Sequence, residues 1–281
     1  MREISVKTIS ETVEKLFLKA NVTLGEKECA ALIKARDSEV DNTAKNVMKT
    51  IVSNLSAAKE SEIPICQDTG MAVVFLDIGQ DVHVTGGDIY DAVNEGVSRA
   101  YTDGYFRASV VDDPVFERKN TLNNTPAVIH TNIVKGDKIK ITALPKGFGS
   151  ENKSALKMLK PTSTVKDIIE FTVETVKNAG SGACPPLFIG VGIGGTFEYA
   201  PILAKRALAR GIDAPNPDER YAKLERQMLD EINALGIGPQ GFGGRNTALG
   251  VNIEYFPTHI AGLPVAVNVC CHVMRHESAI I

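Results

Sequence analysis

The sequence predicts a mixed α/β fold in which a helical N-terminal layer packs on a mixed β-sheet within one large domain. Apolar residues recur at helical spacing through the first sixty residues, and short apolar runs alternate with amphipathic segments after Pro64. No internal repeat or low-complexity linker interrupts the chain. We therefore expect a single domain over residues 1–281, with residues 1–62 as its helical layer.

Three helices are expected before Pro64. In the first, Ser10 is expected to cap a segment that carries Val13 and Phe17 on its apolar face. The second is expected over 26–36 and the third over 42–58, because both repeat the helical spacing of apolar residues. Pro64 then ends the helical region.

Strands and helices alternate after Pro64. The apolar run 72–78 is expected to be a buried strand, and a helix is expected after Asp88. The runs 127–134 and 138–144 flank Lys135–Gly136–Asp137 and are expected to form a hairpin. The remaining expected elements are a helix over 164–178 that stops at Gly180, a strand at 187–191, helices at 197–210 and 217–235, and strands at 247–255 and 264–269.

The composition excludes several classes of protein. The chain has 31 basic and 34 acidic residues and a formal net charge of −3, with no basic run to neutralise phosphates, so no nucleic-acid partner is expected. No stretch approaches about 18 uninterrupted apolar residues, so no membrane association is expected. The first 19 residues mix both charges and lack the apolar centre of a signal peptide. We therefore expect a cytoplasmic protein.

The five cysteines fall into different surroundings. They are scattered and odd in number, so no disulfide framework is expected. Cys29 occupies an apolar helical position and is expected to be a buried filler. Cys66, Cys184 and the Cys270–Cys271 pair instead lie beside glycine, proline or polar residues. Such loops expose amide groups and suit a cofactor or a substrate carboxylate.

The spacing of these cysteines bears on the type of cofactor. Structural zinc sites contain close cysteine pairs of the C-x₂-C type, whereas Cys66, Cys184 and Cys270 are widely separated in the chain. Three distant thiolates suit a [4Fe–4S] cluster better, because thiolates are its normal ligands. Three ligands would leave one iron open as a Lewis acid for dehydration chemistry. Spacing alone leaves this as one interpretation among others.

Glycine-rich segments provide the second signal. Gly190–Gly195 formally fits the dinucleotide fingerprint, but Asp213, about twenty residues later, follows no strand, so this interpretation is rejected. The turns at Lys146–Lys153 and Gly241–Asn246 have polar tips. Either turn could offer backbone amides to carboxylate oxygens or be an ordinary tight turn.

Taken together, these motifs resemble those of the α subunit of iron–sulfur-dependent hydro-lyases, which include class I fumarate hydratase and L-tartrate dehydratase. The matching segments run in order from about residue 40 to the end, and their joint occurrence is specific. They are Pro64-Ile-Cys-Gln-Asp-Thr-Gly70, Arg107-Ala-Ser109, Lys146-Gly-Phe-Gly-Ser-Glu-Asn-Lys153, Gly180-Ser-Gly-Ala-Cys-Pro185, Gly192-Ile-Gly-Gly195, Gly241-Phe-Gly-Gly244, Thr258-His259 and Cys271.

The resemblance implies a [4Fe–4S] cluster with one iron not ligated by cysteine. Its metal ligands would be Cys66, Cys184 and Cys271. Cys271 is preferred to Cys270 because the family's ligand directly precedes a polar or small residue and an arginine-containing segment, which here ends at Arg275.

The resemblance also assigns roles to other residues. Asp68 and His259 would be catalytic, Asp68 by hydrogen bonding the substrate hydroxyl or moving a proton and His259 as a carboxylate donor or relay. Substrate-binding residues would be Gln67 beside the open iron, Arg107 with its bidentate fork, and Gly149 through its amide.

The implied reaction is the reversible trans addition of water to fumarate, which gives L-malate. In the family, the proton-abstracting base and further carboxylate clamps come from a C-terminal β region. This chain ends ten residues after Cys271, so we expect a separate β subunit that completes the active site in a hetero-oligomer acting on a small dicarboxylate. Two alternatives remain open: the α subunit of L-tartrate dehydratase, and a non-catalytic iron–sulfur module for redox sensing or assembly.

Overall fold

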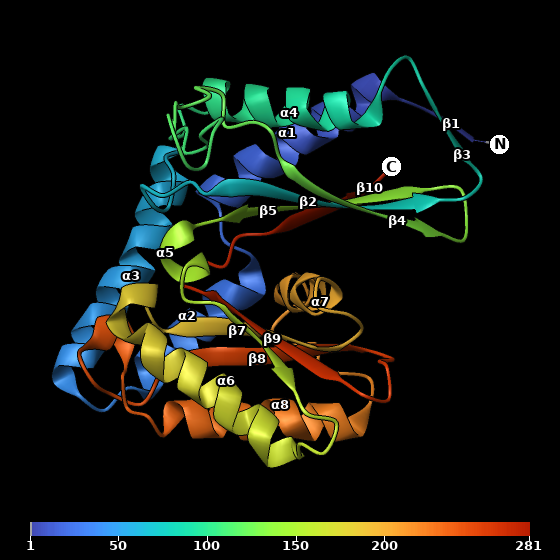
Figure 1. Ribbon diagram of the computed structural model, residues 1–281. Helices are drawn as coiled ribbons and strands as arrows, with labels where there is room; N and C mark the ends of the chain where they lie inside the picture. The colour runs from blue at the N-terminus through green and yellow to red at the C-terminus, as the bar shows by residue number, and fades with distance from the viewer. Residues whose placement is uncertain (1) are drawn as a thin grey trace. The chain divides into compact units, whose positions relative to one another are not determined.

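The protein is mixed α/β, as expected, in a computed structural model that describes residues 2–281 (Figure 1). The chain divides into two compact units, each assembled from stretches that are far apart in the sequence. Unit 1 contains Met1–Gly25, Leu55–Phe148 and Arg275–Ile281, and unit 2 contains Glu26–Asn54 and Gly149–Met274. One domain over residues 1–281 therefore stays a prediction, and the expected helical layer at 1–62 is shared between the two units.

Unit 1 is built on a four-stranded sheet in the order β10-β5-β2-β4. Helices α1 and α4 cover one face of this sheet (Figure 1), and their apolar side chains form a common core with β2 and β5. Strand β1 pairs in parallel with β3 beside it. The elements are β1 (Arg2–Ser5), α1 (Val6–Val22), β2 (Met71–Gly79), β3 (Val82–Thr85), α4 (Ile89–Asp103), β4 (Val128–Val134), β5 (Ile139–Lys146) and β10 (Glu277–Ile280).

The expected hairpin between 127–134 and 138–144 is wrong in its pairing. Both strands form, as β4 and β5, but β2 lies between them, parallel to β4 and antiparallel to β5. The predicted turn instead bonds to the end of β2, where the Gly79 amide donates to the Lys138 carbonyl at 2.8 Å and the Asp81 amide donates to Gly136 at 3.0 Å. The apolar residues of β2 are buried along most of the strand, and its central position pairs both of its edges, with β4 on one side and β5 on the other.

Helix α1 begins earlier than expected. Its N-cap is Ser5, whose hydroxyl accepts from the Thr8 amide at 3.1 Å, because β1 delivers the chain to that point. Ser10, the expected cap, is buried inside the helix and accepts a hydrogen bond from Arg99 at 2.9 Å. The next two helices are confirmed as α2 (Glu26–Ser38) and α3 (Asn42–Ser61), which ends before Pro64.

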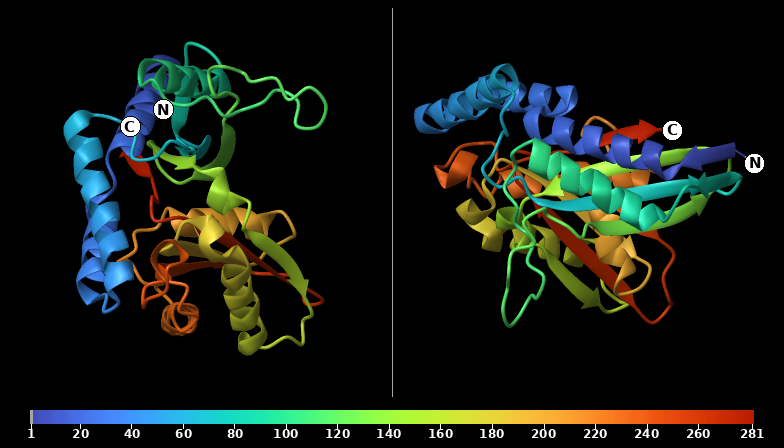
Figure 2. Two further views of the ribbon diagram at one scale, coloured as in Figure 1. Left: turned by 90° about the vertical axis from the view of Figure 1, so that its left-hand side faces the viewer. Right: turned by 90° about the horizontal axis from the view of Figure 1, so that it is seen from above.

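A long loop joins α4 to β4 in unit 1. It covers residues 104–127 and projects from this unit, as the green trace in both views of Figure 2 shows. Val111 and Asn120 form an isolated antiparallel bridge within it, so its outer part is a small hairpin and not an irregular coil.

Unit 2 is built on a second four-stranded sheet, in the order β6-β9-β7-β8. Helix α7 covers one face, while α6 and α8 cover the other (Figure 1). Strand β7 is fully buried and pairs in parallel with β8 and antiparallel with β9. The elements are α5 (Phe148–Glu151), which starts at the last residue of unit 1, β6 (Ala155–Leu159), α6 (Val165–Ala179), β7 (Leu187–Gly194), α7 (Tyr199–Leu208), α8 (Glu219–Asn233), β8 (Ala248–Phe256) and β9 (Leu263–Cys270).

The glycines of β7 have a packing role. A Cβ at Gly190 would lie 2.1 Å from the Ala204 carbonyl oxygen, and one at Gly192 would lie 2.0 Å from that of Ala200. Helix α7 therefore approaches the strand backbone more closely than any side chain would allow. The glycine run that formally fits a dinucleotide fingerprint is explained by this close helix–strand contact.

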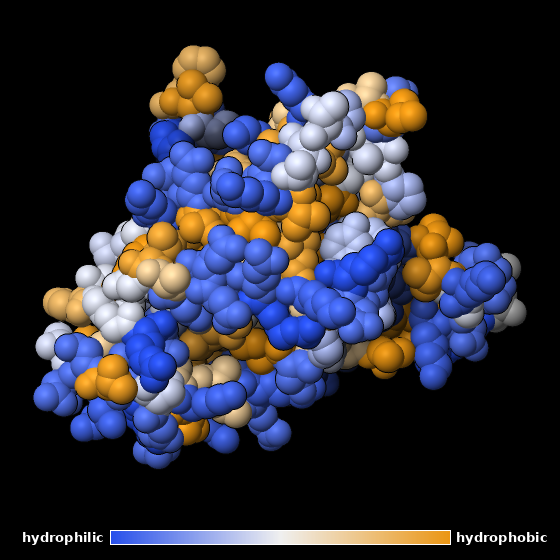
Figure 3. Space-filling model, turned by 90° about the horizontal axis from the view of Figure 1, so that it is seen from below, coloured by the Kyte–Doolittle hydropathy of each residue, from blue (hydrophilic) through white to orange (hydrophobic). Residues whose placement is uncertain are grey.

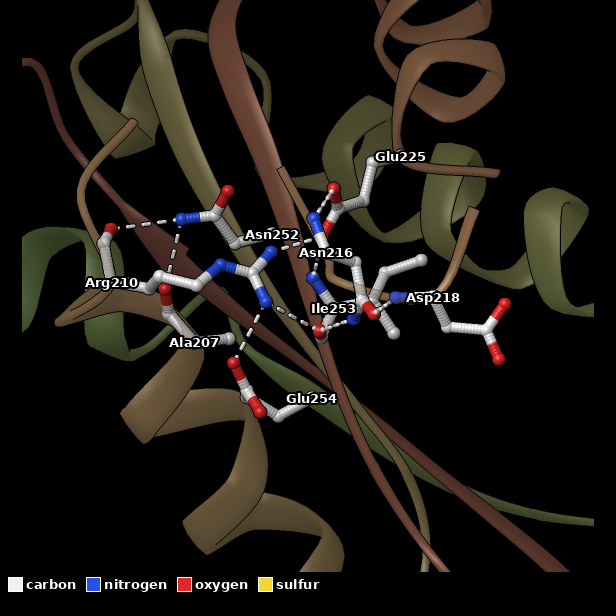
Figure 4. A network of polar contacts seen from close by, with 8 residues as sticks. All are labelled: Ala207, Arg210, Asn216, Asp218, Glu225, Asn252, Ile253 and Glu254. Atoms are coloured by element: carbon white, nitrogen blue, oxygen red, sulfur yellow. Dashed lines mark hydrogen bonds and ion pairs between the residues drawn. The ribbon is translucent and has the colours of Figure 1, made fainter. Parts of the chain in front are cut away.

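A buried polar network fixes the segment between α7 and α8 against β8 (Figure 4). Arg210 forms ion pairs with Glu225 and Glu254, and it donates to the Ile253 carbonyl at 3.0 Å. Asn252 in turn donates to the Arg210 carbonyl at 2.9 Å. Each charge in this network faces an opposite charge or a backbone partner, so the network is structural.

The outer faces of α6 and α8 are polar. Thr164 and Asp167 form a capping box at the start of α6, and Gly180 ends the helix at φ 53°, as expected. Figure 3 views the molecule from below with respect to Figure 1. It shows hydrophilic side chains over most of this surface, with smaller hydrophobic groups among them. Among residues 2–281, no helix combines the length and apolar character needed to cross a membrane.

Candidate active site

The segment Cys66–Gly70 of unit 1 forms a tight turn before β2. The Ile65 amide donates to the Asn21 carbonyl at 3.0 Å, which ties the start of the turn to helix α1. The Asp68 amide donates to the Cys66 sulfur at 3.4 Å. An amide donor of this kind stabilises a thiolate, so the half-buried Cys66 has the surroundings of a metal ligand.

Asp68 is held in one position by two backbone amides. Its Oδ1 accepts from Gly70 at 3.0 Å and its Oδ2 accepts from Phe148 at 2.9 Å. A Cβ at Gly147 would lie only 3.1 Å from Oδ2, so glycine lets the chain pass close to the carboxylate. Each oxygen keeps a second lone pair, so the carboxylate can accept a hydrogen bond from a further donor.

Buried side chains hold the end of the same turn. The Tyr101 hydroxyl donates to the carbonyls of Thr69 and Gly70 at 2.8 and 2.9 Å, and Asn124 donates to Gly70 at 3.0 Å. Burial raises the pKa of Tyr101 well above its usual range, so the hydroxyl stays a donor. These contacts come from residues far away in the sequence and were not anticipated.

A cavity of about 500 Å³ lies against Asp68 in unit 1. The structure brings Asp68 and Arg107 together in its lining, as expected for a carboxylate-binding site. It adds Ser109, which the sequence marked only as part of the Arg107-Ala-Ser109 motif, and Arg118, which the sequence had not marked. The Arg107 carbonyl accepts from the Thr69 hydroxyl at 3.0 Å, which joins the two segments. Gln67 is exposed beside Asp68 and does not line the cavity.

In unit 2, the structure brings the Cys184 segment and the Cys271 segment together. Cys184 follows a short 3-10 turn and adopts left-handed backbone angles, φ 56° and ψ 60°. Its carbonyl accepts from the His272 amide at 3.4 Å and lies 2.9 Å from His272 Nδ1. Cys184 is exposed and Cys271 is half-buried. Two of the three expected thiolate ligands therefore lie on adjoining segments.

The two members of the cysteine doublet differ in their surroundings. Cys270 ends strand β9, pairs with Phe188 and is buried in an apolar cluster with Leu208 and Met274. Cys271 lies one residue beyond the strand. The choice of Cys271 as the ligand stays a prediction, and the burial of Cys270 supports it.

Glycine-rich turns surround Cys184. A Cβ at Gly241 would lie 2.5 Å from the Ser181 side chain, so this turn packs directly on the segment before Cys184. Gln240, which was not expected at the site, donates from its side chain to the Pro185 carbonyl at 2.8 Å and lies 3.3 Å from His272 Nδ1. Its place just before the glycine turn is the only signal that could have marked it.

Gly149 and His259 occupy different ends of unit 2. A Cβ at Gly149 would lie 4.0 Å from the Gly182 carbonyl oxygen, so Gly149 adjoins the Cys184 turn. His259 is exposed in the turn between β8 and β9, where its Nδ1 accepts from the Ala261 amide at 3.1 Å. The pairing of β7 with both neighbours puts this turn at the opposite end of the sheet from Cys184. The structure therefore does not bring His259 to the cysteines of unit 2.

Comparison with known proteins identifies the family. Residues 10–280 match the family described as fumarate hydratase (Fumerase). The chain belongs to this family. Like other members of the fumarate hydratase family, the protein is a hydro-lyase, which favours an enzyme over a non-catalytic module.

Two curated relatives cover nearly the whole chain. A Methanocaldococcus jannaschii protein, provisionally named L(+)-tartrate dehydratase subunit alpha, is 42% identical over 94% of this chain and 94% of its own length. The L(+)-tartrate dehydratase subunit alpha of Escherichia coli O157:H7 is 27% identical over all of this chain and 93% of its own length.

Among residues 2–281, no group of three or more His, Cys, Asp or Glu side chains is placed to hold a metal ion. The expected ligands are divided, with Cys66 in unit 1 and the other two cysteines in unit 2. The donor chemistry of each segment, a thiol with an amide donor or an accessible thiol in a glycine-rich turn, still fits an iron–sulfur cluster.

Proposed function

We propose that the protein is the cytoplasmic α subunit of an iron–sulfur fumarate hydratase, which interconverts fumarate and L-malate together with a separate β subunit. The observation that carries this proposal is the cavity in unit 1, which Asp68 and Arg107 line together, with the Asp68 amide donating to the sulfur of Cys66. The family match over residues 10–280 supports the same reaction.

We propose Cys66, Cys184 and Cys271 as ligands of a [4Fe–4S] cluster in which one iron has no cysteine ligand. When bound, such a cluster supplies a Lewis acid for the substrate hydroxyl and carboxylate. The amide donor on the Cys66 sulfur and the accessibility of Cys184 support this ligand set.

The chain's own residues bind and orient the substrate. Arg107 offers a bidentate fork to one carboxylate, with Gln67 and the Gly149 amide as further polar contacts. Asp68 is placed to hydrogen-bond the substrate hydroxyl through the lone pairs that its two amide donors leave open. In hydration it takes a proton from the attacking water, and in dehydration it returns that proton to the hydroxyl, which leaves as water. No step is assigned to His259, because its turn lies at the opposite end of the unit 2 sheet from Cys184.

The β subunit would supply the base that removes the proton from the adjacent carbon. Support for a second chain comes from the relatives, which are named as α subunits and match this chain over nearly its whole length. The α chain alone should therefore bind iron and sulfide and lack hydratase activity.

A second candidate is the α subunit of L(+)-tartrate dehydratase, because the curated relatives described above carry that name. Both reactions remove water from a hydroxylated four-carbon dicarboxylate, and the residues assigned above suit either substrate. The two candidates therefore differ in substrate, not in chemistry.

The test is anaerobic co-expression of this chain with its β partner, followed by assays of fumarate hydration, malate dehydration and tartrate dehydration. We expect fumarate and malate to be interconverted by the complex and by neither chain alone. A higher kcat/KM for tartrate than for malate would favour the second candidate. Full activity of the isolated chain would contradict the need for β, and inactivity of the complex on all three substrates would contradict the proposed function.

A further inference from the structure

Glu151 joins three elements of unit 2 at one point. It ends the short helix α5, two residues after Gly149. Its Oε1 forms an ion pair with Lys205 of helix α7, and its Oε2 accepts from the Asn268 side chain of strand β9 at 2.9 Å. The Glu151 and Lys205 side chains are 26% and 12% exposed, so solvent ions screen this pair much less than a surface pair.

Ser154 attaches the other end of the same turn to strand β9. Its hydroxyl oxygen accepts from the Asn268 side chain at 3.0 Å and from the Val269 amide at 3.1 Å. Within the turn, the Ser154 amide donates to the Glu151 carbonyl at 3.0 Å. The turn at residues 151–154 is therefore held at both ends by two successive residues of β9.

The Asn268 side chain has a defined orientation in this network. Its Nδ2 faces a carboxylate oxygen of Glu151, which only accepts hydrogen bonds, so the amide cannot be turned around. Its Oδ1 is buried and has no hydrogen-bond partner among residues 2–281. The contact with Glu151 is therefore kept although it leaves one polar atom of Asn268 unpaired.

The ion pair is not needed to attach helix α7 to the sheet. Ala200 and Ala204 of α7 already form a buried apolar cluster with Ala266 of β9. Apolar side chains in place of a buried ion pair are often as stabilising as the pair itself. What the charges of Glu151 and Lys205 add is a directional link from α7 to helix α5.

This link connects two parts of the proposed site. Gly149 lies two residues before Glu151, and Cys271 lies three residues after Asn268. We propose that Glu151 is a positioning residue that, through Lys205 and Asn268, holds the Gly149 amide in a fixed place relative to the strand leading to Cys271. The inference rests on the proposed function, in which Gly149 binds substrate, and adds to it a residue that acts through others.

The test compares the same substitution at two ion pairs of unit 2. Glu225 of α8 also pairs with a cation on or just after α7, in this case Arg210, but it faces β8 and the loop before α8. Glu151→Gln and Glu225→Gln each remove one charge and keep the shape of the side chain. Succinate, which has no double bond or hydroxyl to react, would be titrated into each anaerobic αβ complex by calorimetry. The midpoint of thermal unfolding and the KM and kcat for fumarate would be measured on the same samples.

We expect Glu151→Gln to weaken succinate binding and to raise KM by roughly tenfold, the contribution of about one hydrogen bond, with little change in kcat. An amide has one acceptor oxygen where the carboxylate has two, so its NH₂ group must face either Lys205 or Asn268, and the link to α5 loosens. Glu225→Gln is the matched control. It should lower the unfolding midpoint and leave succinate affinity and KM at their wild-type values.

A double variant tests whether the link itself matters. Glu151→Gln combined with Asn268→Asp exchanges the amide and the carboxylate between the two positions. The amide at position 151 can then accept from Lys205 and donate to the carboxylate at position 268, which can also accept from the Ser154 hydroxyl. We expect this variant to recover most of the succinate affinity that Glu151→Gln loses.

Three results would each overturn the positioning role, even if the complex hydrates fumarate. They are wild-type succinate affinity in Glu151→Gln, an equal loss of affinity in Glu225→Gln, and no recovery in the double variant. A wild-type complex that does not bind succinate would overturn it as well. Weaker succinate binding in Glu151→Gln alone and its recovery in the double variant would keep this inference, and inactivity of the same complex on all three substrates would contradict only the proposed function.

Discussion

The turn at Cys66–Gly70 and the turn at Cys184 are held in place in different ways. In unit 1, the turn is fastened by buried side chains from distant segments, above all Tyr101 and Asn124. In unit 2, the Cys184 turn relies on close backbone packing against Gly241 and on His272, which follows the next expected ligand. The first turn ends in two buried residues that are held by hydrogen bonds from buried side chains, and the second is an exposed turn shaped by glycines.

This difference matters for how each turn responds to substitution. Disturbing the Cys66 turn means disturbing buried contacts, so it should cost stability. Disturbing the Cys184 turn displaces an exposed segment, so it should affect cofactor binding more than folding.

Substitution of the proposed cysteine ligands should have the largest effect, the loss of the cluster. Cys66→Ser, Cys184→Ser and Cys271→Ser should each abolish cluster binding, because each removes one of three thiolate ligands. Cys29→Ser and Cys270→Ser are the controls and should retain iron and sulfide. Metal and sulfide analysis of anaerobically reconstituted protein measures this, and loss of the cluster in Cys270→Ser with retention in Cys271→Ser would reverse the ligand choice.

Substitutions of Asp68 and His259 should differ in their effect on kcat. Asp68 lines the cavity, whereas His259 lies far from the cysteines of unit 2. Asp68→Asn should lower kcat by roughly 100- to 10,000-fold, because it removes a group that takes part in proton transfer. His259→Ala should lower kcat far less than Asp68→Asn does, because His259 lies at the opposite end of the sheet from Cys184. Steady-state kinetics of the αβ complex measure both, and an equally large loss in His259→Ala would restore its expected catalytic role.

Two glycines test the contrast directly. A Cβ at Gly70 (φ 79°) would meet the buried Lys146 backbone at 2.7 Å, and one at Gly241 (φ 81°) would meet exposed Ser181 at 2.5 Å. Gly70→Ala should lower the free energy of unfolding by about 3 kcal/mol or more, since strain and a backbone clash add. Gly241→Ala should cost less stability and instead reduce cluster content.

Gly136→Ala is the control for that comparison. Gly136 also has a positive φ, 108°, but no atom lies within 4 Å of the position that a Cβ would take there. The substitution should cost only about 1 kcal/mol, the contribution of backbone strain alone. Denaturant unfolding of the three variants gives the free energies, and equal losses at Gly70 and Gly241 would remove the distinction between the two turns.

Substitution of Glu39 should have the smallest effect, a change in stability that depends on pH. It is buried in unit 2 and anchors the far end of the Gly241 turn, accepting from the Arg245 amide at 3.0 Å and from Asn246 at 2.9 Å. Burial opposes ionisation of Glu39, but these hydrogen bonds outweigh it and lower the pKa below its usual value.

Because the pKa of Glu39 is lower in the folded protein than in the unfolded chain, its ionised carboxylate stabilises the fold at neutral pH. That contribution is lost as the pH falls through the lowered folded-state pKa. Glu39→Gln should therefore be less stable than the wild type at neutral pH, and the difference should shrink in acid. Unfolding curves measured across this range test the prediction. A difference that does not change with pH would show that the anchor depends on shape and not on charge.

The sequence predicted most elements of unit 2, although not α5 or β6, because their signals are local. The helix that became α6 carries its capping residues and its glycine stop within its own segment, and the strand at 187–191 is a continuous apolar run. The hairpin of unit 1 failed for the opposite reason. Which strand lies beside β4 depends on which strands pair with the two edges of β2, and no local turn signal records that competition.

The candidate site shows the same division. Cys66, Cys184, Asp68 and Arg107 stand in short motifs that can be identified along the chain. Arg118 has no such motif, and it reaches the cavity only because the hairpin folds back beside Arg107. Likewise, Tyr101 holds the Cys66 turn from a helix more than thirty residues away, with no pattern in the sequence to mark the contact.

The sequence by itself determined the fold class, the family and the separation of three candidate ligands from Cys29 and Cys270, because these depend on residue type and immediate neighbours. The tertiary structure decided which strand lies between β4 and β5, where Asp68 finds its two amide donors, and which second arginine lines its cavity. These depend on contacts between residues far apart in the chain, and only the packed core selects among such contacts.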